Sequence, residues 1–93
     1  MKVVISTRAR RDLLGVGEWI ERDHPARATS YVEELYALCR SLGEFPNGCP
    51  PAPEFGAGIR KRTHGNYLIL YRVARHVTIV SIRHAARRRD PLA

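Results

Sequence analysis

Apolar residues recur in three short runs along the last third of the chain, between Gly58 and His84. The runs cover residues 58–64, 67–73 and 77–84, and they are rich in β-branched and aromatic side chains. Short turns separate them, and runs of this kind joined by turns of two or three residues are typical of antiparallel strands. The pattern therefore predicts a three-stranded antiparallel meander.

The first 54 residues follow a mainly helical pattern. Residues 2–5 predict a short strand, and Ser6 or Thr7 is expected to cap the helix that follows, because a hydroxyl accepts from an orphan backbone amide. One apolar stripe of this helix has helical spacing: Ala9, Leu13, Val16 and Ile20. Gly15 and Gly17 are expected to mark a close approach by a second helix.

A second helix is predicted after Asp23-His24-Pro25, since proline suits the first helical turn. Its apolar positions keep helical spacing up to Gly43: Ala28, Tyr31, Val32, Leu35, Leu38, Cys39 and Leu42. The segment 45–53 holds four of the six prolines and predicts a loop. The chain is thus expected to be one α+β domain, residues 1–93: an N-terminal strand, a two-helix hairpin, and a mostly antiparallel sheet ending in the meander.

Turn lengths determine which side chains of the meander share a face. A two-residue turn followed by a three-residue loop pairs Arg62 with Ile69 and Tyr67 with Arg83. One face is then aliphatic and is expected to contact the helices: Leu68, Leu70, Val80 and Ile82. The other face is mixed and is expected to bind a partner: Arg60, Arg62, Tyr67, Ile69, Tyr71, Ile79, Ser81 and Arg83.

The net charge of +7 is unevenly distributed. Residues 1–54 carry seven basic and eight acidic side chains, whereas residues 55–93 carry nine basic side chains and a single acid, Asp90. A one-sided positive charge favours an acidic or polyanionic partner. The alternative is a solvated basic surface without a partner.

Several classes of function are disfavoured. No run approaches the ~18 apolar residues of a membrane span, and the N-terminus is too short for a secretory signal, so a cytoplasmic protein is expected. Cys39 and Cys49 match no zinc pattern, and Cys39 is expected to serve packing. His24, His64 and His76 lack metal-ligand spacing and are expected to be exposed. We therefore expect neither a metal nor a cofactor.

Short motifs follow one another along nearly the whole chain. They are Ala9-x-x-Asp12-Leu13, Gly58-x-Arg60, Tyr67-x-Ile69-x-Tyr71-x-Val73, Val77-x-Ile79, Ile82-x-His84 and Arg88-Arg89-Asp90. In this order they resemble the RelE/ParE toxin superfamily. The ending, a histidine followed by Arg-Arg-Asp, is most similar to ParE, although this chain has one or two extra residues in between. The resemblance implies a toxin of a type II toxin–antitoxin system.

A ParE-like function implies that the chain inhibits DNA gyrase by binding, without catalysis, and that a cognate antitoxin neutralises it. The antitoxin is expected to be ParD-like and partly acidic, and to cover the second face of the sheet or the groove beside the helices with an amphipathic helix or an added strand. Arginine forks suit carboxylates and phosphates. The expected target-binding residues are Arg60, Arg62, Tyr67, Tyr71, Arg83, Arg87, Arg88 and Arg89.

A RelE-like function is the alternative, and it implies a ribosome-dependent mRNA endoribonuclease. The candidate catalytic residues are then Arg60, Arg62, Arg83 and His84, because a cation cluster stabilises the phosphorane charge and a histidine moves protons. Active RelE-like chains usually carry a Tyr or His-Tyr near the C-terminus. Here Ala85 follows His84, and no aromatic residue comes after it. We therefore expect a binding protein rather than an enzyme.

Structural roles remain open for several of these residues. Tyr67 and Tyr71 also suit cross-strand packing, and His84 also suits a position at the end of the last strand. A third possibility is a degraded toxin that binds only its antitoxin and regulates the operon.

Overall fold

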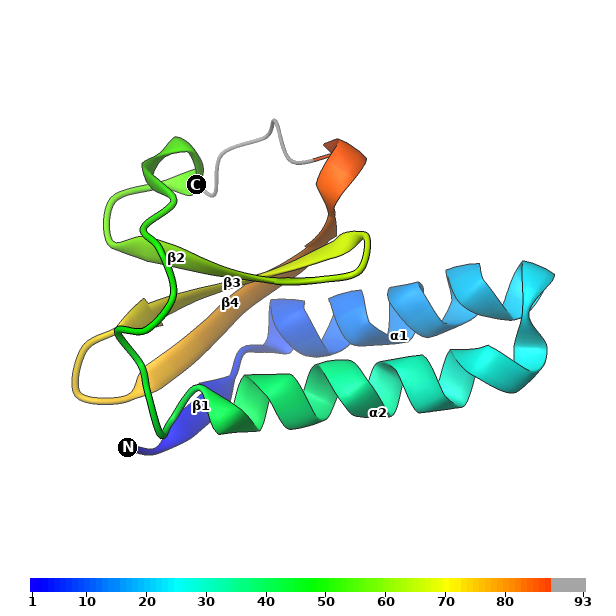
Figure 1. The fold of residues 1–93 in the computed structure, drawn as a ribbon, viewed down its shortest axis with the longest axis horizontal. Helices are drawn as coiled ribbons and strands as arrows, with labels where there is room; N and C mark the ends of the chain where they lie inside the picture. The colour runs from blue at the N-terminus through cyan, green and yellow to red at the C-terminus, as the bar shows by residue number, and fades with distance from the viewer. Residues whose placement is uncertain (88–93) are drawn as a thin grey trace.

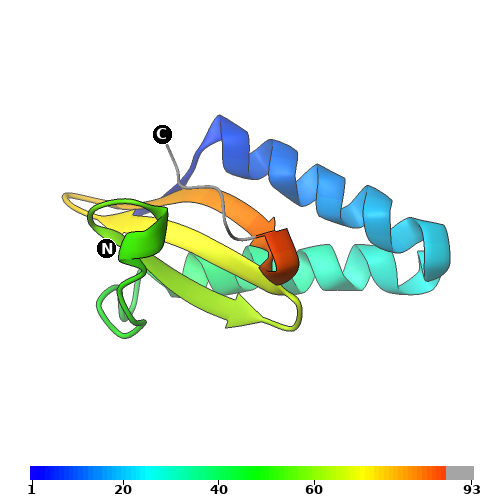
Figure 2. The ribbon, with the colours of Figure 1, turned by 90° about the horizontal axis from the view of Figure 1, so that it is seen from above.

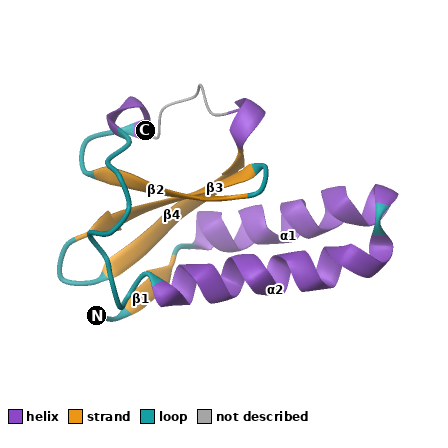
Figure 3. Cartoon of the chain, viewed as in Figure 1, coloured by secondary structure: helices purple, strands orange, loops and turns teal. Residues whose placement is uncertain are grey.

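The computed structural model describes residues 1–87, and it places a two-helix hairpin against one side of a four-stranded sheet (Figures 1 and 3). The elements are β1 (Val3–Ile5), α1 (Thr7–Asp23), α2 (Pro25–Ser41), the 3-10 helix η1 (Pro53–Phe55), β2 (Ile59–His64), β3 (Tyr67–Val73), β4 (Val77–His84) and the 3-10 helix η2 (Ala85–Arg87). The strand order is β1-β4-β3-β2, with β1 parallel to β4 and the other pairs antiparallel. The predicted α+β order is confirmed.

Ser6 connects the start of α1 to the sheet. Its Oγ accepts a hydrogen bond from the Ala9 amide at 3.1 Å, which confirms the predicted cap. The same hydroxyl donates to the Val80 carbonyl at 3.1 Å, and the Ser6 amide donates to the Ile79 carbonyl, also at 3.1 Å. The cap therefore fixes the first turn of α1 beside β4.

The two helices pack closely at Gly17. A Cβ at this position would lie 3.2 Å from Cγ2 of Val32, so the expected close approach of α2 is confirmed there. It is wrong for Gly15, where a Cβ would meet nothing within 4 Å. The far ends of both helices, around His24, extend beyond the sheet in both views (Figures 1 and 2).

The register of the meander follows the prediction up to Ile79 and then shifts. The β2–β3 pairing is as expected, and Tyr71 lies opposite Ile79. Leu70, however, lies opposite Ser81, so Val80 is an extra residue and forms a β-bulge. The predicted pairing of Tyr67 with Arg83 is therefore wrong, because a bulge displaces every later residue by one position.

The prediction of which face contacts the helices is also wrong. Four residues of the predicted mixed face lie in the core against the helices: Tyr67, Ile69, Tyr71 and Ile79. The bulge brings Ile82 from the predicted aliphatic face into the same core. Tyrosine is suited to this position because its ring packs in the core while its hydroxyl finds an acceptor at the margin. The Tyr71 hydroxyl donates to the Pro46 carbonyl at 3.0 Å.

The opposite face of the sheet packs against another segment of the same chain. Leu68 and Leu70 form a second cluster with Ala52, Phe55 and Ile59. After α2 the chain passes the sheet and reaches η1 on the side away from the helices (Figures 1 and 2). Phe55 of η1 is fully buried there, so a short segment is enough to close this face.

A polar cluster joins α2 to the turn between β2 and β3. His64 Nε2 lies 2.9 Å from Glu34 Oε1, and the Tyr31 hydroxyl donates to the His64 carbonyl at 2.7 Å. Arg27 forms an ion pair with the same carboxylate. The hydrogen bonds from Arg27 and then His64 lower the pKa of Glu34 to about 2. The expectation of an exposed residue is therefore wrong for His64, whose side chain is 30% exposed, and it is confirmed for His24 and His76.

Candidate functional site

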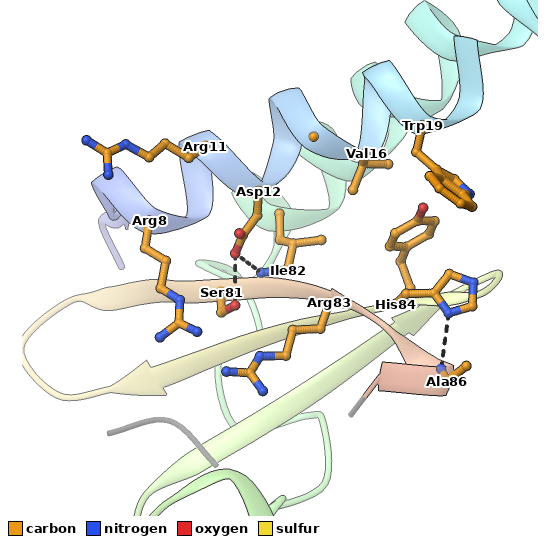
Figure 4. Close-up of a pocket in the computed structure, with 12 residues that line it drawn as sticks. Arg8, Arg11, Asp12, Val16, Trp19, Ser81, Ile82, Arg83, His84 and Ala86 are labelled. Atoms are coloured by element: carbon orange, nitrogen blue, oxygen red, sulfur yellow. Dashed lines mark hydrogen bonds between the residues drawn. The ribbon is translucent and has the colours of Figure 1, made fainter. Parts of the chain in front are cut away.

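The candidate site is a groove of about 610 Å³ between α1 and the C-terminal end of β4 (Figure 4). Both elements contribute charged and aromatic side chains to it. The lining residues are Arg8, Arg11, Asp12, Gly15, Val16, Trp19, Tyr67, Ser81, Ile82, Arg83, His84 and Ala86.

Asp12 holds the β4 wall of this groove in place. One oxygen of its carboxylate accepts from the Ser81 hydroxyl at 2.8 Å and from the Ile82 amide at 2.9 Å (Figure 4). Within residues 1–87, β1 pairs with β4 only as far as Ile79, and Asp12 supplies beyond it the acceptor that a neighbouring strand would give. These bonds fasten the segment that follows the bulge at Val80.

One end of the groove is cationic. Arg8 and Arg11 come from the start of α1, and the side chains of Arg8 and Arg83 extend to the same side of β4 (Figure 4). The first turn of α1 contains no acidic residue, although the positive end of the helix dipole favours one. Within residues 1–87, neither Arg8 nor Arg11 forms an ion pair. This end therefore suits carboxylate or phosphate groups.

The other end of the groove is aromatic. Trp19 is half-exposed, and the rings of Tyr67 and His84 meet edge to face with centroids 5.2 Å apart. His84 Nδ1 accepts a hydrogen bond from the Ala86 amide at 3.1 Å, so a neutral His84 ring carries its proton on Nε2. A ligand with an anionic part and an apolar or planar part matches the two ends together.

Arg83 does not lie with the other arginines of the expected cation cluster, whereas Arg60 and Arg62 share a face as predicted. Arg60 pairs with Tyr71 on the side of the helices, and it donates to the Cys49 carbonyl at 2.6 Å, which anchors the proline-rich loop. Arg83 pairs with Leu68 on the opposite side, and its guanidinium lies 5.8 Å from the Phe55 ring centroid. The predicted grouping of Arg60 and Arg83 on one face is therefore wrong.

The other expected site residues fall into three groups. Arg62 is exposed on β2, outside the groove. Tyr71 is fully buried, and burial together with the neighbouring Cys49 raises its pKa, so its predicted position on an open surface is wrong. Arg87 belongs to η2, whereas Arg88 and Arg89 lie outside the described residues.

The sequence-based candidates did not include four charged or aromatic residues of the groove. Arg8, Arg11 and Trp19 are exposed residues of α1 that line the groove, and Asp12 was noted only as part of a motif. The sequence carried one usable signal. Several arginines at the start of a helix, with no acidic residue in the first turn, add positive charge to the positive end of the helix dipole. An anion bound there would be stabilised by both.

None of the helices in residues 1–87 is both long and apolar enough to cross a bilayer. The same residues contain no group of three or more His, Cys, Asp or Glu side chains placed to hold a metal ion.

Comparison with known proteins agrees with the fold and the motif order. Residues 3–89 match the family model of the ParE toxin of the type II toxin–antitoxin system parDE. Toxin ParE1 of Caulobacter vibrioides is 31% identical over 81 residues, which cover 86% of this chain and 84% of the relative. The putative toxin Y4kP of Sinorhizobium fredii is 31% identical over 78 residues, with 84% and 81% covered.

A solved structure titled as the chromosomal ParDE toxin–antitoxin system of P. aeruginosa has a similar fold. Its TM-score with this chain is 0.79 at 19% identity, and the match covers 90% of this chain and 95% of the other. The family model spans most of the chain, and both curated relatives exceed 30% identity over most of their length. The chain belongs to the ParE toxin family of type II toxin–antitoxin systems.

Proposed function

We propose that this ParE-family toxin inhibits DNA gyrase by binding to it, and that a cognate, partly acidic ParD-like antitoxin neutralises the toxin. The observation that carries the proposal is the cationic end of the α1–β4 groove, where Arg8 and Arg11 have no acidic partner in residues 1–87. Positive side chains near the N-terminus of a helix are unfavourable for the stability of the free helix. A bound anionic group would offset this cost, so such cations favour an anionic partner. The gyrase contact includes this end of the groove and the tail arginines Arg87, Arg88 and Arg89.

Binding rather than RNA cleavage is favoured by the way the arginines are separated. A RelE-type reaction needs cations and an acid–base group around one phosphate. Arg60 instead holds the loop at Cys49, and Arg83 lies across the sheet from it. His84 stands at the aromatic end of the groove, where its Nδ1 accepts from the Ala86 amide.

The function is tested by inducing the chain alone and together with the reading frame next to its gene. We expect growth arrest with filamentation and a DNA-damage response, intact messages, and relief by the neighbouring product. With purified gyrase we expect loss of supercoiling activity. Cleaved messages with unaffected gyrase would establish the RelE-like alternative, and normal growth would contradict both toxin functions.

The contribution of the groove is tested with the double substitution Arg8→Glu/Arg11→Glu. Position 8 lies in the first turn of α1, where an acidic residue favours the helix, and position 11 is exposed, so this variant is expected to stay folded while losing inhibition of gyrase about tenfold or more. The matched control is Arg75→Glu, another exposed arginine, which lies in the β3–β4 loop at the opposite end of β4. Equal inhibition of gyrase by the double variant and the control would mean that the groove does not contact gyrase.

A further inference from the structure

Gly15 lies in the middle of α1 without a reason in the packing of the fold. A Cβ at this position would meet nothing within 4 Å, whereas a Cβ at Gly17 would lie 3.2 Å from Cγ2 of Val32. Glycine weakens a helix interior because it loses more backbone entropy on folding than other residues, so alanine at position 15 would strengthen α1. Gly15 does, however, line the α1–β4 groove, and its missing side chain affects the shape of that groove.

Gly15 stands between the two ends of the groove. Arg11, Gly15 and Trp19 follow one another at intervals of four residues, so they form one row along the surface of α1. Arg11 and Trp19 lie at opposite ends of this stretch of the helix (Figure 4). A side chain at position 15 would project between them, and glycine therefore leaves the passage from the cationic end to the aromatic end open.

The groove has the size of a site for one small molecule. Its volume of about 610 Å³ falls within the range of about 300–1,000 Å³ that is typical of ligand sites. Eight residues separate Arg11 from Trp19, and at a helical rise of about 1.5 Å per residue they span roughly 12 Å. This span matches a nucleotide from its base to its second or third phosphate, with the sugar in the middle.

The two ends of the groove also differ chemically as the two ends of such a nucleotide do. Arg8 and Arg11 are neighbours on the surface of α1, and guanidinium groups bind phosphate oxygens through paired hydrogen bonds. At the other end Trp19 is 50% exposed, and the Arg22 guanidinium packs 5.2 Å from the centroid of its ring. His84 lines the same end, and nucleobases stack readily on aromatic rings of this kind.

The cations and the aromatic rings are segregated along the groove and do not alternate. A site for single-stranded nucleic acid follows the backbone with positive charge and offers successive aromatic rings to successive bases. Here Arg8 and Arg11 lie at one end and Trp19 at the other, while the guanidinium of Arg83 packs 5.8 Å from the Phe55 ring centroid. One base followed by several phosphates therefore fits this arrangement better than a strand does.

We propose that the α1–β4 groove binds a nucleoside triphosphate, with its base against Trp19 and His84, its sugar over Gly15 and its phosphates at Arg8 and Arg11. Neither gyrase nor the antitoxin is needed for this binding, so the proposal goes beyond the proposed function without resting on it. Because the same arginines belong to the proposed gyrase contact, the nucleotide and gyrase would compete for the groove.

The first experiment uses fluorescence, because Trp19 is the only tryptophan of the chain. The toxin, made by cell-free synthesis, is titrated with ATP, with adenosine and with inorganic tripolyphosphate. We expect ATP to quench Trp19 saturably and to bind about tenfold or more tightly than either adenosine or tripolyphosphate, because each of them lacks one half of the ligand. Equal affinities for ATP and tripolyphosphate would mean that a basic chain attracts any polyanion, and this result would overturn the proposal.

The same signal distinguishes a free nucleotide from a nucleic-acid strand. Tetrathymidylate carries both bases and phosphates, and we expect it to bind about tenfold more weakly than ATP, because its phosphates alternate with its bases. Binding of tetrathymidylate as tight as that of ATP, or tighter, would overturn the proposal in favour of a single strand.

The second experiment fills the middle of the groove with the substitution Gly15→Met. Methionine is the better helix former, so the variant is expected to melt at the same temperature as the wild type or higher. We expect its affinity for ATP, measured by calorimetry, to fall about tenfold or more, because the ligand and the new side chain need the same space. The matched control is Thr29→Met, at an exposed position of α2 outside the groove, which should change the affinity less than about twofold. Wild-type affinity for ATP in a folded Gly15→Met variant would contradict the proposal.

The double substitution Arg8→Gln/Arg11→Gln tests the phosphate end separately. We expect the affinity for ATP to fall about tenfold or more while the affinity for adenosine stays the same, because only ATP carries phosphates. An unchanged affinity for ATP would overturn the proposal. Growth arrest and gyrase inhibition are measured independently on the wild-type toxin. A toxin that inhibits gyrase without binding ATP would refute only the nucleotide site, and one that binds ATP without inhibiting gyrase would refute only the proposed target.

Discussion

The side of the sheet that faces the helices and the side that faces η1 are closed by very different amounts of chain. Two 17-residue helices cover the first, whereas a three-residue 3-10 helix and a proline-rich loop cover the second. Both sides nevertheless bury residues completely, including Ile69 and Tyr71 on one and Phe55 and Leu70 on the other. A single aromatic residue on a short segment can thus bury one face of a sheet as a helix does, although fewer residues pack around it.

The largest effect is expected from truncating neighbouring residues of β3, one on each side. Ile69→Ala should lower the free energy of unfolding by about 4–5 kcal/mol, because packed helices relax little around a cavity. Leu70→Ala should cost about 2–3 kcal/mol, because η1 and its loop can move into the space. Urea denaturation of both variants gives the comparison. Equal losses would mean that the thin cover is as rigid as the helix pair.

The inversion of the two sides explains why sequence predicted the elements better than their contacts. Periodicity located both helices and the β2–β3 register, because these depend on local spacing and turn length. It failed where burial depends on a distant partner. Tyr71 looked like a surface residue, yet its hydroxyl reaches the Pro46 carbonyl, and Phe55 gave no periodic signal because η1 is too short to have one.

The bulge at Val80 escaped prediction for the same reason. The contacts that fasten the strand after it come from Asp12, which lies 69 residues away from Ser81 in the chain. The bulge separates Arg83 from Arg60 and Arg62, so the expected cluster of three arginines does not form. Arg8 and Arg11 could not be predicted as groove residues without knowing how α1 lies beside β4. The net positive charge could be read from the sequence, whereas the positions of the arginine side chains relative to one another depend on tertiary contacts.

The second effect concerns Asp12, which joins α1 to β4 at the margin of the helix-facing side. Asp12→Ala removes the acceptor of the Ser81 hydroxyl and the Ile82 amide, and leaving such groups unpaired should cost about 1–3 kcal/mol. The Ile82 amide should also exchange faster with solvent. Asp12→Asn keeps one oxygen acceptor and should restore much of the loss. An unchanged exchange rate of the Ile82 amide in the alanine variant would show that the bulge does not need the contact with Asp12.

A smaller effect is expected at the hydroxyl that links the helix-facing core to the loop leading toward η1. Tyr71→Phe keeps the ring and removes only the bond to the Pro46 carbonyl, so it should cost about 1 kcal/mol in chemical denaturation. Tyr36→Phe is the matched control, because Tyr36 is 39% exposed and its hydroxyl makes no hydrogen bond with the described residues. A loss at Tyr71 no larger than at Tyr36 would count against a tethering role.

The smallest effect is expected in the melting temperature, when the surface ion pairs on the two sides of the sheet are removed in turn. On the helix side Glu34 binds Arg27 and His64, and these contacts lower its pKa from 4.5 to about 2. A carboxyl group with a lowered pKa stabilises the fold fully above its unfolded pKa, and this contribution disappears as the pH falls toward the folded value. The melting temperature of the wild type should therefore exceed that of Glu34→Gln above about pH 4.5, and the two should converge toward pH 2.

On the other side of the sheet, Glu54 lies 3.8 Å from Lys61 without a close hydrogen bond, so Glu54→Gln serves as the control. Exposed pairs contribute little, and this one is expected to leave the melting temperature almost unchanged across the same pH range. Melting curves of the three proteins between pH 2 and pH 6 decide the matter. A Glu34→Gln curve parallel to the wild type would mean that the cluster at His64 does not fasten the β2–β3 turn to α2. The helix side would then gain as little stability from its surface ion pairs as is expected for the η1 side.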